Sequence, residues 1–401
     1  MGCAKNSVDS DSMAELLIRD GYRAVMKPDH ASVLIVNTCG FIESARQESI
    51  AKLQELADGK RKGQLLIAAG CLTQRYGAEV AKQVPGVDGI LGTRRWMDIV
   101  QVVRGLRKTA HPEPIYHLPA SATVGVDEAD VLRAHAYGST AYLKIADGCR
   151  RPCAFCSIPL IKGTTISRPM ETILDEARRL RDMGVRELIL IAQDTTDYGH
   201  DLGIKDGLAI LLEDLSTTVP DLDWIRIMYA YPGCVTDRLI DVMSSSRQVL
   251  HYLDIPLQHA NPETLRRMKR PSNMDWVHKT LEKMRASMPD LAIRTTFIVG
   301  YPGETEEEFR TLEEFVQEAR FDRAGAFQFS FEPGTSSEPL GDPIPPEVKQ
   351  ERFYRLMELQ ENISLQVNQS YVGRTLDVLI EGYNDGMAVG RSYRDTPEVD
   401  G

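Results

Sequence analysis

The chain lacks any apolar run long enough to cross a membrane, and no signal peptide precedes its first cysteine. These two absences argue against a membrane-spanning or secreted protein and favour the cytoplasm, where thiols stay reduced. Basic residues are not in excess either, because 47 Lys and Arg stand against 58 Asp and Glu, for a net charge of -11. Such a surface is poorly suited to binding nucleic acid through its overall field, and it favours a basic protein as a partner.

Cysteine is scarce, with seven in 401 residues, yet three fall close together at Cys149, Cys153 and Cys156. No fourth ligand lies nearby in sequence, which disfavours a tetrahedral zinc site. An odd number of thiols in a reducing compartment disfavours disulfides. An iron–sulfur cluster usually takes four cysteines, so three from one loop would leave one iron open. That iron could bind a small molecule and pass it an electron.

The length of 401 residues predicts two or three domains, and 42% hydrophobic with 26% charged residues is typical of a globular protein. In the amino-terminal part, short apolar strands alternate with amphipathic helices. This alternation predicts an open parallel sheet with helices on its faces. The expected elements are a helix over 9–20, capped by Asp9, Ser10, Asp11 and Ser12 and ended by Gly21, a strand over 32–36, a helix over 41–56, a strand over 65–69 and a helix from about 74.

Three further cysteines fall where strands of this sheet should end. Cys39 follows the strand over 32–36, Cys71 follows the strand over 65–69, and Cys3 precedes the first helix. Ligands of open α/β sheets gather beyond the carboxyl ends of the strands, so the three thiols should share one edge. They could hold a second cluster with one open iron, or they could be three separate buried cysteines. Position alone leaves both interpretations open.

The central part shows six strand-then-helix units and predicts a partial TIM-like barrel whose active face is formed by the strand ends. Small and polar residues follow these strands, and Gly or Pro there lets the backbone approach a ligand closely. His259 also falls on this face without a readable role, whereas Cys234 and His278 are expected to be structural. The expected strands are 141–146, 187–192, 225–231, 250–255, 292–299 and 325–331.

An irregular connection with three prolines, and a short strand at His117-Leu118, precedes the barrel. A long amphipathic helix beginning at Pro345 and Pro346 closes it. A strand over 372–382 and a turn at 384–386 then indicate the start of a small β-barrel. We expect a shortened form of a longer protein, without a strand ahead of Cys3 and without a closed final barrel. The expected divisions are an amino-terminal domain over 1–108, a linker over 109–138, a central domain over 139–369 and a partial barrel over 370–401.

The spacing of Cys149, Cys153 and Cys156, with Phe155 before the last cysteine, resembles that of the radical S-adenosylmethionine (SAM) enzymes. The whole chain resembles the methylthiotransferases of that superfamily, which combine an amino-terminal cluster domain, a SAM barrel and a TRAM domain. Its motifs are similar to those of the protein-modifying branch of the family. The motifs are Gly2-Cys3-Ala4-Lys5-Asn6-Ser7-Val8-Asp9-Ser10, Asn37-Thr38-Cys39-Gly40-Phe41-Ile42, Ala69-Gly70-Cys71-Leu72, Ala192-Gln193-Asp194-Thr195-Thr196, Pro256-Leu257-Gln258-His259 and Gly390-Arg391-Ser392-Tyr393.

This resemblance implies a transferase with two [4Fe-4S] clusters that adds a methylthio group to the β-carbon of an aspartate in small-subunit ribosomal protein twelve. One SAM would methylate a sulfur carried by the amino-terminal cluster, and a second SAM would yield the radical that opens the unactivated C–H bond. A reducing electron donor is also implied. No catalytic acid or base is singled out. The implied ligands are Cys3, Cys39 and Cys71 for one cluster and Cys149, Cys153 and Cys156 for the other, with Phe155, Gln193, Gly300 and Glu304 as SAM contacts.

Three other functions fit some of these features. The sister branch of the family modifies adenosine in tRNA, and a TRAM domain would serve it too. A radical SAM enzyme of another reaction type would not need the amino-terminal cysteines. A non-catalytic iron–sulfur protein could use the same thiols for sensing. Reductive cleavage of SAM separates the last of these from the enzymes, and product analysis separates the two branches.

Overall fold

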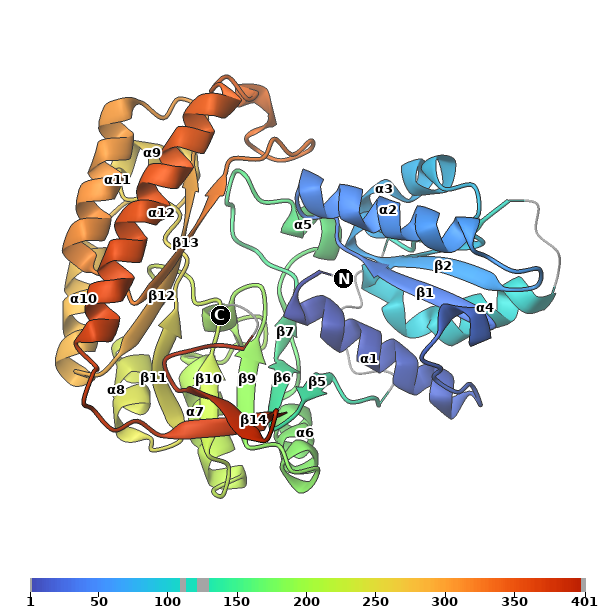
Figure 1. Cartoon of the computed structure of the whole chain (residues 1–401), viewed down its shortest axis with the longest axis horizontal. Helices are drawn as coiled ribbons and strands as arrows, with labels where there is room; N and C mark the ends of the chain where they lie inside the picture. The colour runs from blue at the N-terminus through green and yellow to red at the C-terminus, as the bar shows by residue number, and fades with distance from the viewer. Residues whose placement is uncertain (1, 109–112, 121–129, 398–401) are drawn as a thin grey trace. The chain divides into compact units, whose positions relative to one another are not determined.

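The computed structural model describes residues 2–108, 113–120 and 130–397, drawn in Figure 1. The chain divides into two compact units. Residues 121–129 of the predicted linker lie outside the described ranges, as do 109–112 and the last four positions. The first unit contains Met1–His135, Tyr142–Arg151 and Ser157–Arg168, and the second contains Ala136–Ala141, Pro152–Cys156 and Pro169–Gly401.

The first unit is a parallel sheet between two layers of helices. Its strands follow the order β1-β2-β3-β4, and each neighbouring pair is parallel. Alternate residues of β2 enter opposite cores: Ile67 packs with α1 and α4, whereas Leu66 packs with α2 and α3. The elements are α1 (Ala4–Arg19), β1 (Val33–Thr38), α2 (Glu43–Asp58), β2 (Leu65–Gly70), α3 (Cys71–Gln83), β3 (Gly89–Gly92), α4 (Ile99–Lys108) and β4 (Ile115–His117), with short 3-10 turns η1 (Pro28–His30) and η2 (Thr93–Asp98).

The predicted start of the first helix is wrong. α1 begins at Ala4, with Cys3 as its N-cap, and no side chain caps it. Asp9 and Ser12, expected as capping residues, are instead buried inside the helix. Ser12 Oγ donates to the carbonyl of Val8 at 2.9 Å and lies 3.0 Å from the carbonyl of Leu132. The predicted end is correct, because the helix stops at Arg19.

A seven-stranded sheet of order β13-β12-β11-β10-β9-β6-β5 forms the framework of the central part. The run β9 to β13 is parallel throughout. β9 is buried along its whole length, as expected for a parallel strand covered on both faces. The elements are β5 (Ala134–Tyr137), β6 (Thr140–Lys144), β7 (Ala146–Asp147), α5 (Ile158–Lys162), β8 (Ile166–Ser167), α6 (Met170–Asp182), β9 (Glu187–Ile191), η3 (Thr195–Asp197), α7 (Gly207–Thr218), β10 (Trp224–Ile227), α8 (Asp237–Ser245), β11 (Val249–Asp254), α9 (Pro262–Arg267), α10 (Met274–Ser287), β12 (Ala292–Val299), α11 (Glu306–Ala319) and β13 (Arg323–Gln328).

Side chains and backbone angles set the ends of several central elements. α11 begins with a capping box, in which Thr305 and Glu308 satisfy each other's backbone N–H groups. β10 ends at Ile227 rather than at residue 231, because Tyr229 adopts a φ of +62° that no strand allows. The last strand likewise runs over 323–328 rather than 325–331. These shifts leave the predicted α/β class confirmed.

The last described elements are η4 (Glu338–Leu340), α12 (Pro346–Gln369), β14 (Val378–Asn384) and β15 (Met387–Ser392). α12 lies beside α11 in Figure 1 and begins with proline at its first position, as predicted. β14 and β15 pair antiparallel around Asp385 and Gly386, whose positive φ angles suit a tight hairpin turn. The predicted turn at 384–386 is confirmed, and the strand before it starts six residues later than expected. No helix within the described ranges has the length and hydropathy needed to cross a membrane.

Candidate active site

The amino-terminal cysteines lie at the carboxyl ends of the strands in the first unit. Thr38 and Gly70, the last residues of β1 and β2, face each other across the parallel pair. Cys39 follows the first and Cys71 follows the second, so both leave the sheet at one edge. Cys3 begins the helix that packs against this sheet. The three cysteines differ in exposure: Cys3 is exposed, Cys39 is partly buried and Cys71 is buried.

Asn6, in the first turn of α1, ties this helix to both strand ends. Its Nδ2 donates to the carbonyl of Thr38 at 3.3 Å. The thiol of Cys71 donates to Asn6 Oδ1, with 3.8 Å between sulfur and oxygen. A Cβ added to Gly2 would stand 3.4 Å from the Cβ of Cys39, so the start of the chain also lies at this edge. The structure therefore gathers the three cysteines as the strand-end rule predicts.

Each thiol at this edge responds to the charge of its neighbours. Burial raises the pKa of Cys71 to about 12, with Lys162 opposing the rise and the other two cysteines adding to it. Burial also raises the pKa of Cys39, and Cys3 adds to that rise. Around Cys3 desolvation acts in the same direction, but Lys5 and two backbone N–H groups outweigh it and lower the pKa. Three thiolates here would repel one another unless a cationic centre joined them, so this donor set fits an iron–sulfur cluster.

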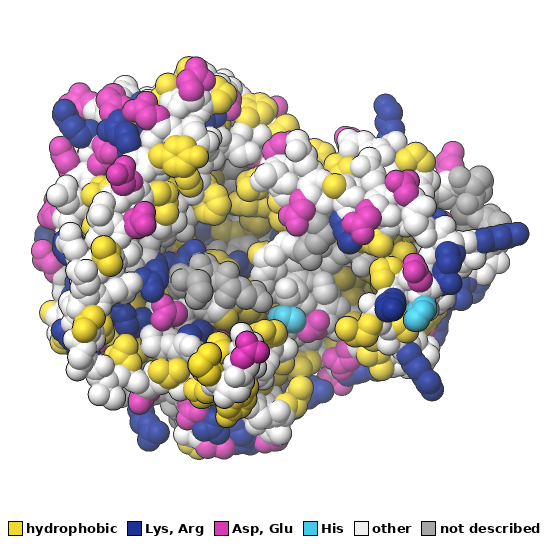
Figure 2. Space-filling view, in the orientation of Figure 1, with side chains coloured by type: hydrophobic (Ala, Val, Ile, Leu, Met, Phe, Trp, Pro, Cys, Tyr) yellow, Lys and Arg dark blue, Asp and Glu magenta, His cyan; other side chains and the backbone are white. Residues whose placement is uncertain are grey.

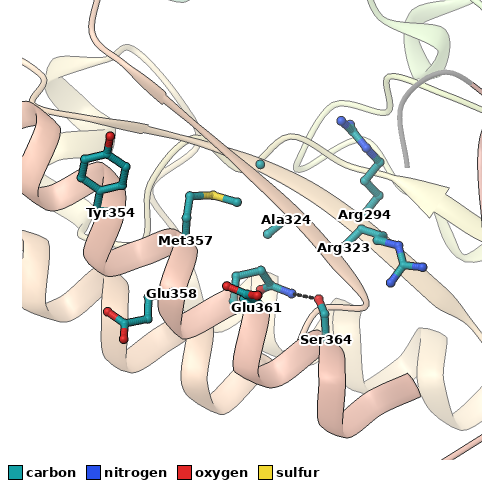
Figure 3. A pocket seen from close by; sticks show the side chains of 10 residues that line it. Arg294, Arg323, Ala324, Tyr354, Met357, Glu358, Glu361 and Ser364 are labelled. Atoms are coloured by element: carbon teal, nitrogen blue, oxygen red, sulfur yellow. Dashed lines mark hydrogen bonds between the residues drawn. The ribbon is translucent and has the colours of Figure 1, made fainter. Parts of the chain in front are cut away.

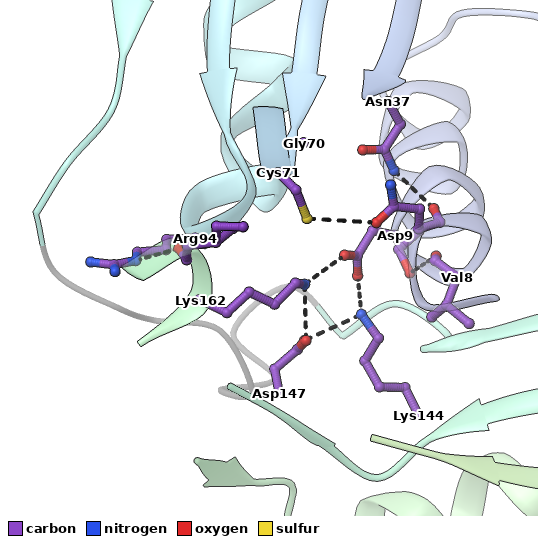
Figure 4. Close-up of polar contacts among 12 residues, drawn as sticks. Val8, Asp9, Asn37, Gly70, Cys71, Arg94, Lys144, Asp147 and Lys162 are labelled. Atoms are coloured by element: carbon purple, nitrogen blue, oxygen red, sulfur yellow. Dashed lines mark hydrogen bonds and ion pairs between the residues drawn. The ribbon is translucent and has the colours of Figure 1, made fainter. Parts of the chain in front are cut away.

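Five charged side chains of the first unit, Asp9, Arg133, Lys144, Asp147 and Lys162, form a buried network. Figure 4 labels Asp9, Lys144, Asp147 and Lys162 of this network. Lys162 Nζ lies 3.2 Å from Asp9 Oδ2 and 2.9 Å from Asp147 Oδ1. Arg133 Nη2 lies 3.1 Å from one oxygen of each carboxylate. Lys144 Nζ bonds Asp9 and lies 3.2 Å from Asp147 Oδ2. All five side chains are at most 3% exposed, so their buried charges depend on these ion pairs.

This network joins α1 to the segment that leads into the central cysteine loop. Burial alone would raise the pKa of Asp9, but Lys144 and Lys162 outweigh it and hold that pKa below its ordinary value of 3.8. The same balance lowers the pKa of Asp147, which stands two residues before Cys149. Both carboxylates are therefore ionised at neutral pH.

We expect Asp9→Asn to lower the free energy of unfolding of the cluster-free protein by about 3–5 kcal/mol, because it leaves buried cations without one carboxylate. Asp11→Asn on the same helix is the matched control, since that carboxylate is 50% exposed and pairs with His135; an exposed pair contributes at most about 1 kcal/mol. The folded-state pKa of Asp9 is depressed, so its stabilisation is present above about pH 4 and lost as the pH falls further. Urea denaturation should show the difference between wild type and Asp9→Asn shrinking below about pH 4. Equal losses in the two variants at pH 7 would contradict this account.

Backbone contacts fix the start of the central cysteine loop. Gly148 has a φ of +76°, and a Cβ there would stand 2.0 Å from the carbonyl oxygen of Thr164. Only glycine fits this position. Cys149 N–H donates to the carbonyl of Gly163 at 3.0 Å, and the N–H of Arg151 points at Cys149 Sγ from 3.5 Å. An N–H directed at the sulfur favours the thiolate that a metal ligand must supply.

The rest of this loop is held within the second unit. Ala154 N–H donates to the carbonyl of Met268 at 2.8 Å, and the carbonyl of Ala154 accepts from the N–H of Ser337 at 2.9 Å. Cys156 N–H donates to the carbonyl of Cys153 at 3.1 Å, which closes a turn between these two cysteines. Neither thiol is in a disulfide. The backbone of this part of the loop is thus fixed.

Phe155 lies in an apolar cluster with Met268, Tyr301 and Phe329, and Ile298 packs beside it. The rings of Tyr301 and Phe329 meet edge to face, with their centroids 5.2 Å apart. Burial raises the pKa of Tyr301 to about 12, so its hydroxyl stays protonated and donates to a backbone carbonyl. The ring of Phe155 therefore anchors the cysteine loop to the end of β12. Its contact with SAM remains a prediction.

Gln193 follows β9 at the carboxyl end of the central sheet. Its Oε1 atom is buried, and none of the described residues donates a hydrogen bond to it. Thr195, two residues on, is held by its Oγ1 donating to the carbonyl of Met228 at 2.8 Å. A buried acceptor without a donor costs about 1–3 kcal/mol, and a ligand with N–H groups would satisfy it. The buried Oε1 acceptor of Gln193 is therefore compatible with the predicted contact with SAM.

Glu304, another predicted SAM contact, is fully engaged by protein groups. Its Oε1 accepts from His259 Nε2 at 3.0 Å, and its Oε2 accepts from the N–H of Gly300 at 2.6 Å and from Arg352 at 2.7 Å. His259 Nδ1 accepts the N–H of Asn261 at 2.9 Å, so the ring proton resides on Nε2. This assigns His259, whose role was unreadable in the sequence, to orienting Glu304. The carboxylate in turn holds the loop after β12.

Gly300 begins that loop with a φ of +72°. A Cβ there would lie 2.4 Å from Cγ of Lys349, so the position requires glycine. The close packing of α12 against the loop explains this requirement, because Lys349 belongs to α12. Gly300 and Glu304 stay predictions as SAM contacts, and the structure gives both a part in shaping the loop.

Sequence reasoning missed the cations that organise both sites. Lys144 and Lys162 come from an apolar strand and a short helix, and Arg352 lies on α12 among its buried residues. A charged residue at an otherwise apolar position is the signal that could have revealed them, because such a charge needs a buried partner. The partners themselves come from distant parts of the chain.

Cys234 and His278 stay predicted as structural residues. Cys234 is half-buried in the turn after β10 and forms no disulfide. His278 lies on α10 with its ring edge-on to Phe315, at 5.3 Å between centroids. Within the described ranges, no group of three or more His, Cys, Asp and Glu side chains is arranged to hold a single metal ion.

A pocket of about 660 Å³ lies between α12 and the beginnings of β12 and β13 (Figure 3). Arg294 and Arg323 line it from the strands, and Glu358 and Ser364 from the helix. Both arginines stand near the amino ends of their strands, whereas the loop after β12 leaves from the carboxyl end. The pocket is therefore separate from the residues that we assign to SAM.

Three segments of the chain match known families. Residues 143–316 match the Radical SAM superfamily, residues 1–92 match the Uncharacterized protein family UPF0004, and residues 372–401 match the TRAM domain. Among solved structures, the radical S-adenosylmethionine methyltransferase TsrM from Kitasatospora setae aligns with a TM-score of 0.60 at 13% identity, over 84% of this chain and 72% of that one. At that identity the likeness shows the fold alone.

Curated relatives are far more similar in sequence. The ribosomal protein uS12 methylthiotransferase RimO of Chloroflexus aurantiacus is 50% identical over 418 residues, covering 100% of this chain and 91% of the relative. The protein of the same name from Roseiflexus sp. is 48% identical over 422 residues, covering 100% and 89%. The fold, the cysteine sets and the matched segments thus define a radical SAM methylthiotransferase with a TRAM segment. Within that class, the chain belongs to the RimO family.

Proposed function

We propose that this chain transfers a methylthio group to the β-carbon of an aspartate in ribosomal protein uS12, the protein named in its relatives. The observation that carries the proposal is the presence of two separate cysteine trios on one chain of this family. A radical SAM enzyme of another reaction type needs only one trio. The second trio supplies a place for the sulfur that the product must contain.

Cys3, Cys39 and Cys71 would hold one [4Fe-4S] cluster, and Cys149, Cys153 and Cys156 would hold the other with SAM. When bound, these groups supply the radical and sulfur chemistry that amino-acid side chains lack. The residues of the chain bind and orient them. Asn6 ties α1 to the strand ends that carry Cys39 and Cys71, and the backbone contacts of Ala154 fix the central loop. No side chain of the protein is expected to act as a base on the β-carbon of the substrate aspartate. The C–H bond there is unactivated, so a base cannot remove its hydrogen as a proton at neutral pH.

The contacts with SAM are assigned to four residues of the second unit. Gln193 Oε1 offers a buried acceptor, and Gly300 permits close approach of the backbone. Phe155 supplies an apolar wall beside the cysteine loop. Glu304 acts on SAM through the loop that it holds, since His259, Arg352 and the N–H of Gly300 occupy its carboxylate.

The proposed organisation has an amino-terminal cluster domain over 1–108, a linker over 109–138, a SAM domain over 139–369 and a partial TRAM domain over 370–401. We also propose a cytoplasmic location, where a one-electron reductant is available and thiolates persist. Charges of both signs intermingle on α11 and α12 in Figure 2, and Arg355 pairs there with Glu306 and Glu313. On the face shown in Figure 2, these two helices therefore carry charges of both signs rather than acidic side chains alone.

We expect the protein to methylthiolate the ribosomal protein and to leave tRNA adenosine unmodified. A basic ribosomal protein is attracted by the net negative charge, whereas a tRNA backbone is repelled by it. The two substrates should be offered separately to the reconstituted protein, and the products analysed by mass spectrometry. Raising the salt concentration should slow the reaction with the ribosomal protein, because ions screen the attraction. Modified tRNA together with unmodified ribosomal protein would assign the chain to the sister branch.

A further inference from the structure

Arg270 presents a hydrogen-bond donor to the sulfur of Cys153. Its Nη1 atom lies 3.5 Å from Cys153 Sγ. Its Nη2 atom donates to the carbonyl of Pro256, and the guanidinium group stacks over the ring of Tyr231 at 4.3 Å from the centroid. One arginine thus has a backbone anchor, an aromatic support and a sulfur contact. Its position is set by contacts other than the sulfur itself.

The backbone that carries Arg270 is shaped to aim it at the cysteine loop. α9 ends at residue 267, and the carbonyl of Met268 accepts the N–H of Ala154, next to the sulfur in question. Lys269 adopts a left-handed φ of +54°, which a lysine rarely adopts. The N–H of Arg270 then donates to the carbonyl of Leu265 at 2.8 Å. Lys269 is strained and lies between two residues with fixed backbone contacts. We infer that this turn is held in order to position the side chain of Arg270.

We propose that Arg270 sets the reduction potential of the iron–sulfur cluster at Cys149, Cys153 and Cys156, through its hydrogen bond and fixed charge beside the ligating sulfur of Cys153. This inference rests on the proposed function, in which Cys153 is a cluster ligand. The reduced cluster carries one more negative charge than the oxidised one. A cationic donor at the sulfur stabilises the reduced state more strongly and so raises the potential. Arg270 is a positioning residue in this account, because it touches the ligand and not SAM.

Arginine suits this role better than lysine. Its guanidinium group remains charged at every pH that the protein meets. Its planar fork can serve the carbonyl of Pro256 and the sulfur of Cys153 at the same time. The neighbouring Arg266 provides the contrast, because its side chain is 56% exposed and pairs with Glu263. Removing that charge changes the net charge of the protein equally without touching the sulfur.

The test is an anaerobic redox titration with dithionite, followed by electron paramagnetic resonance. The parent protein carries Cys3→Ala, Cys39→Ala and Cys71→Ala, so that only the central cluster contributes. In this parent, Arg270→Gln should lower the equilibrium constant for one-electron reduction about tenfold, which moves the midpoint about 59 mV more negative. Arg270→Lys should move it in the same direction by less, since the charge is kept and the fork is lost. Arg266→Gln should leave the midpoint at the parent value.

Three outcomes would overturn the inference. The first is a parent-like midpoint in an iron-loaded Arg270→Gln variant, and the second is an equal shift in Arg266→Gln. The third is loss of iron in Arg270→Gln combined with a parent-like midpoint in Arg270→Lys, which would make the arginine purely structural. A wild-type chain that holds no iron after anaerobic reconstitution would instead refute the proposed function, and this inference with it. Iron content measured before each titration separates these cases.

Discussion

Simultaneous replacement of Cys149, Cys153 and Cys156 by alanine should abolish reductive cleavage of SAM. The same variant should lose roughly half of the about eight irons expected per chain, because two four-iron clusters are divided between the two cysteine sets. Iron analysis after anaerobic reconstitution and chromatography of the deoxyadenosine product measure the two effects. The loss of cleavage should be complete, since in this account SAM is bound only at the cluster held by these three cysteines.

The matched control for this variant is Cys234→Ala. That cysteine is half-buried, forms no disulfide and belongs to neither set. Its replacement should leave the iron content and SAM cleavage at the wild-type level. Continued SAM cleavage by the triple variant would show that the central cluster is held elsewhere, and the account of the loop would then be wrong.

Replacement of Cys3, Cys39 and Cys71 by alanine should have the opposite pattern. Reductive cleavage of SAM should continue, because the cluster that produces the radical is bound by the other set. The methylthio product should disappear, because the site that carries the sulfur is gone. Both quantities can be measured in one reaction mixture, with deoxyadenosine as the record of cleavage and mass spectrometry of the ribosomal protein as the record of transfer.

This second variant also tests whether the amino-terminal cysteines carry the sulfur and whether the two cysteine sets depend on each other. If its methylthio product persists, the three thiols at the edge of the first sheet are structural and the sulfur comes by another route. If cleavage of SAM disappears as well, the two sites depend on each other for folding. The network of Asp9, Lys144 and Lys162 makes that second possibility measurable, because Asp9→Asn perturbs the same region without removing a cysteine.

The architecture was largely predictable because its elements carry strong local signals. β9 is a run of five buried residues, and α12 begins with proline followed by residues at helical spacing. The edge shared by Cys39 and Cys71 follows from the parallel order of two adjacent strands. The short strand β3, with glycine at both ends, gave too little local pattern to be recognised.

The first helix shows where local reasoning failed. Asp9 and Ser12 stand in a stretch typical of a helix cap, so the helix was expected to begin there. In the structure Asp9 is buried, and its carboxylate forms an ion pair with Lys144, which is 135 positions away in the sequence. The contact of Arg270 with Cys153 joins positions 117 apart and has no local signal at all. Such partners are set by the tertiary fold, which periodicity and capping patterns do not encode.

The most direct measurement is mass spectrometry of ribosomal protein uS12 from cells with and without this gene. We expect one aspartate of the protein to carry a methylthio group in place of hydrogen when the gene is present. Fragmentation should locate the added mass at the β-carbon of that residue, and deletion of the gene should remove it. A gene bearing the three alanines at positions 149, 153 and 156 should behave like the deletion. An identical, fully modified ribosomal protein in cells without the gene and without any relative of it would contradict the central claim.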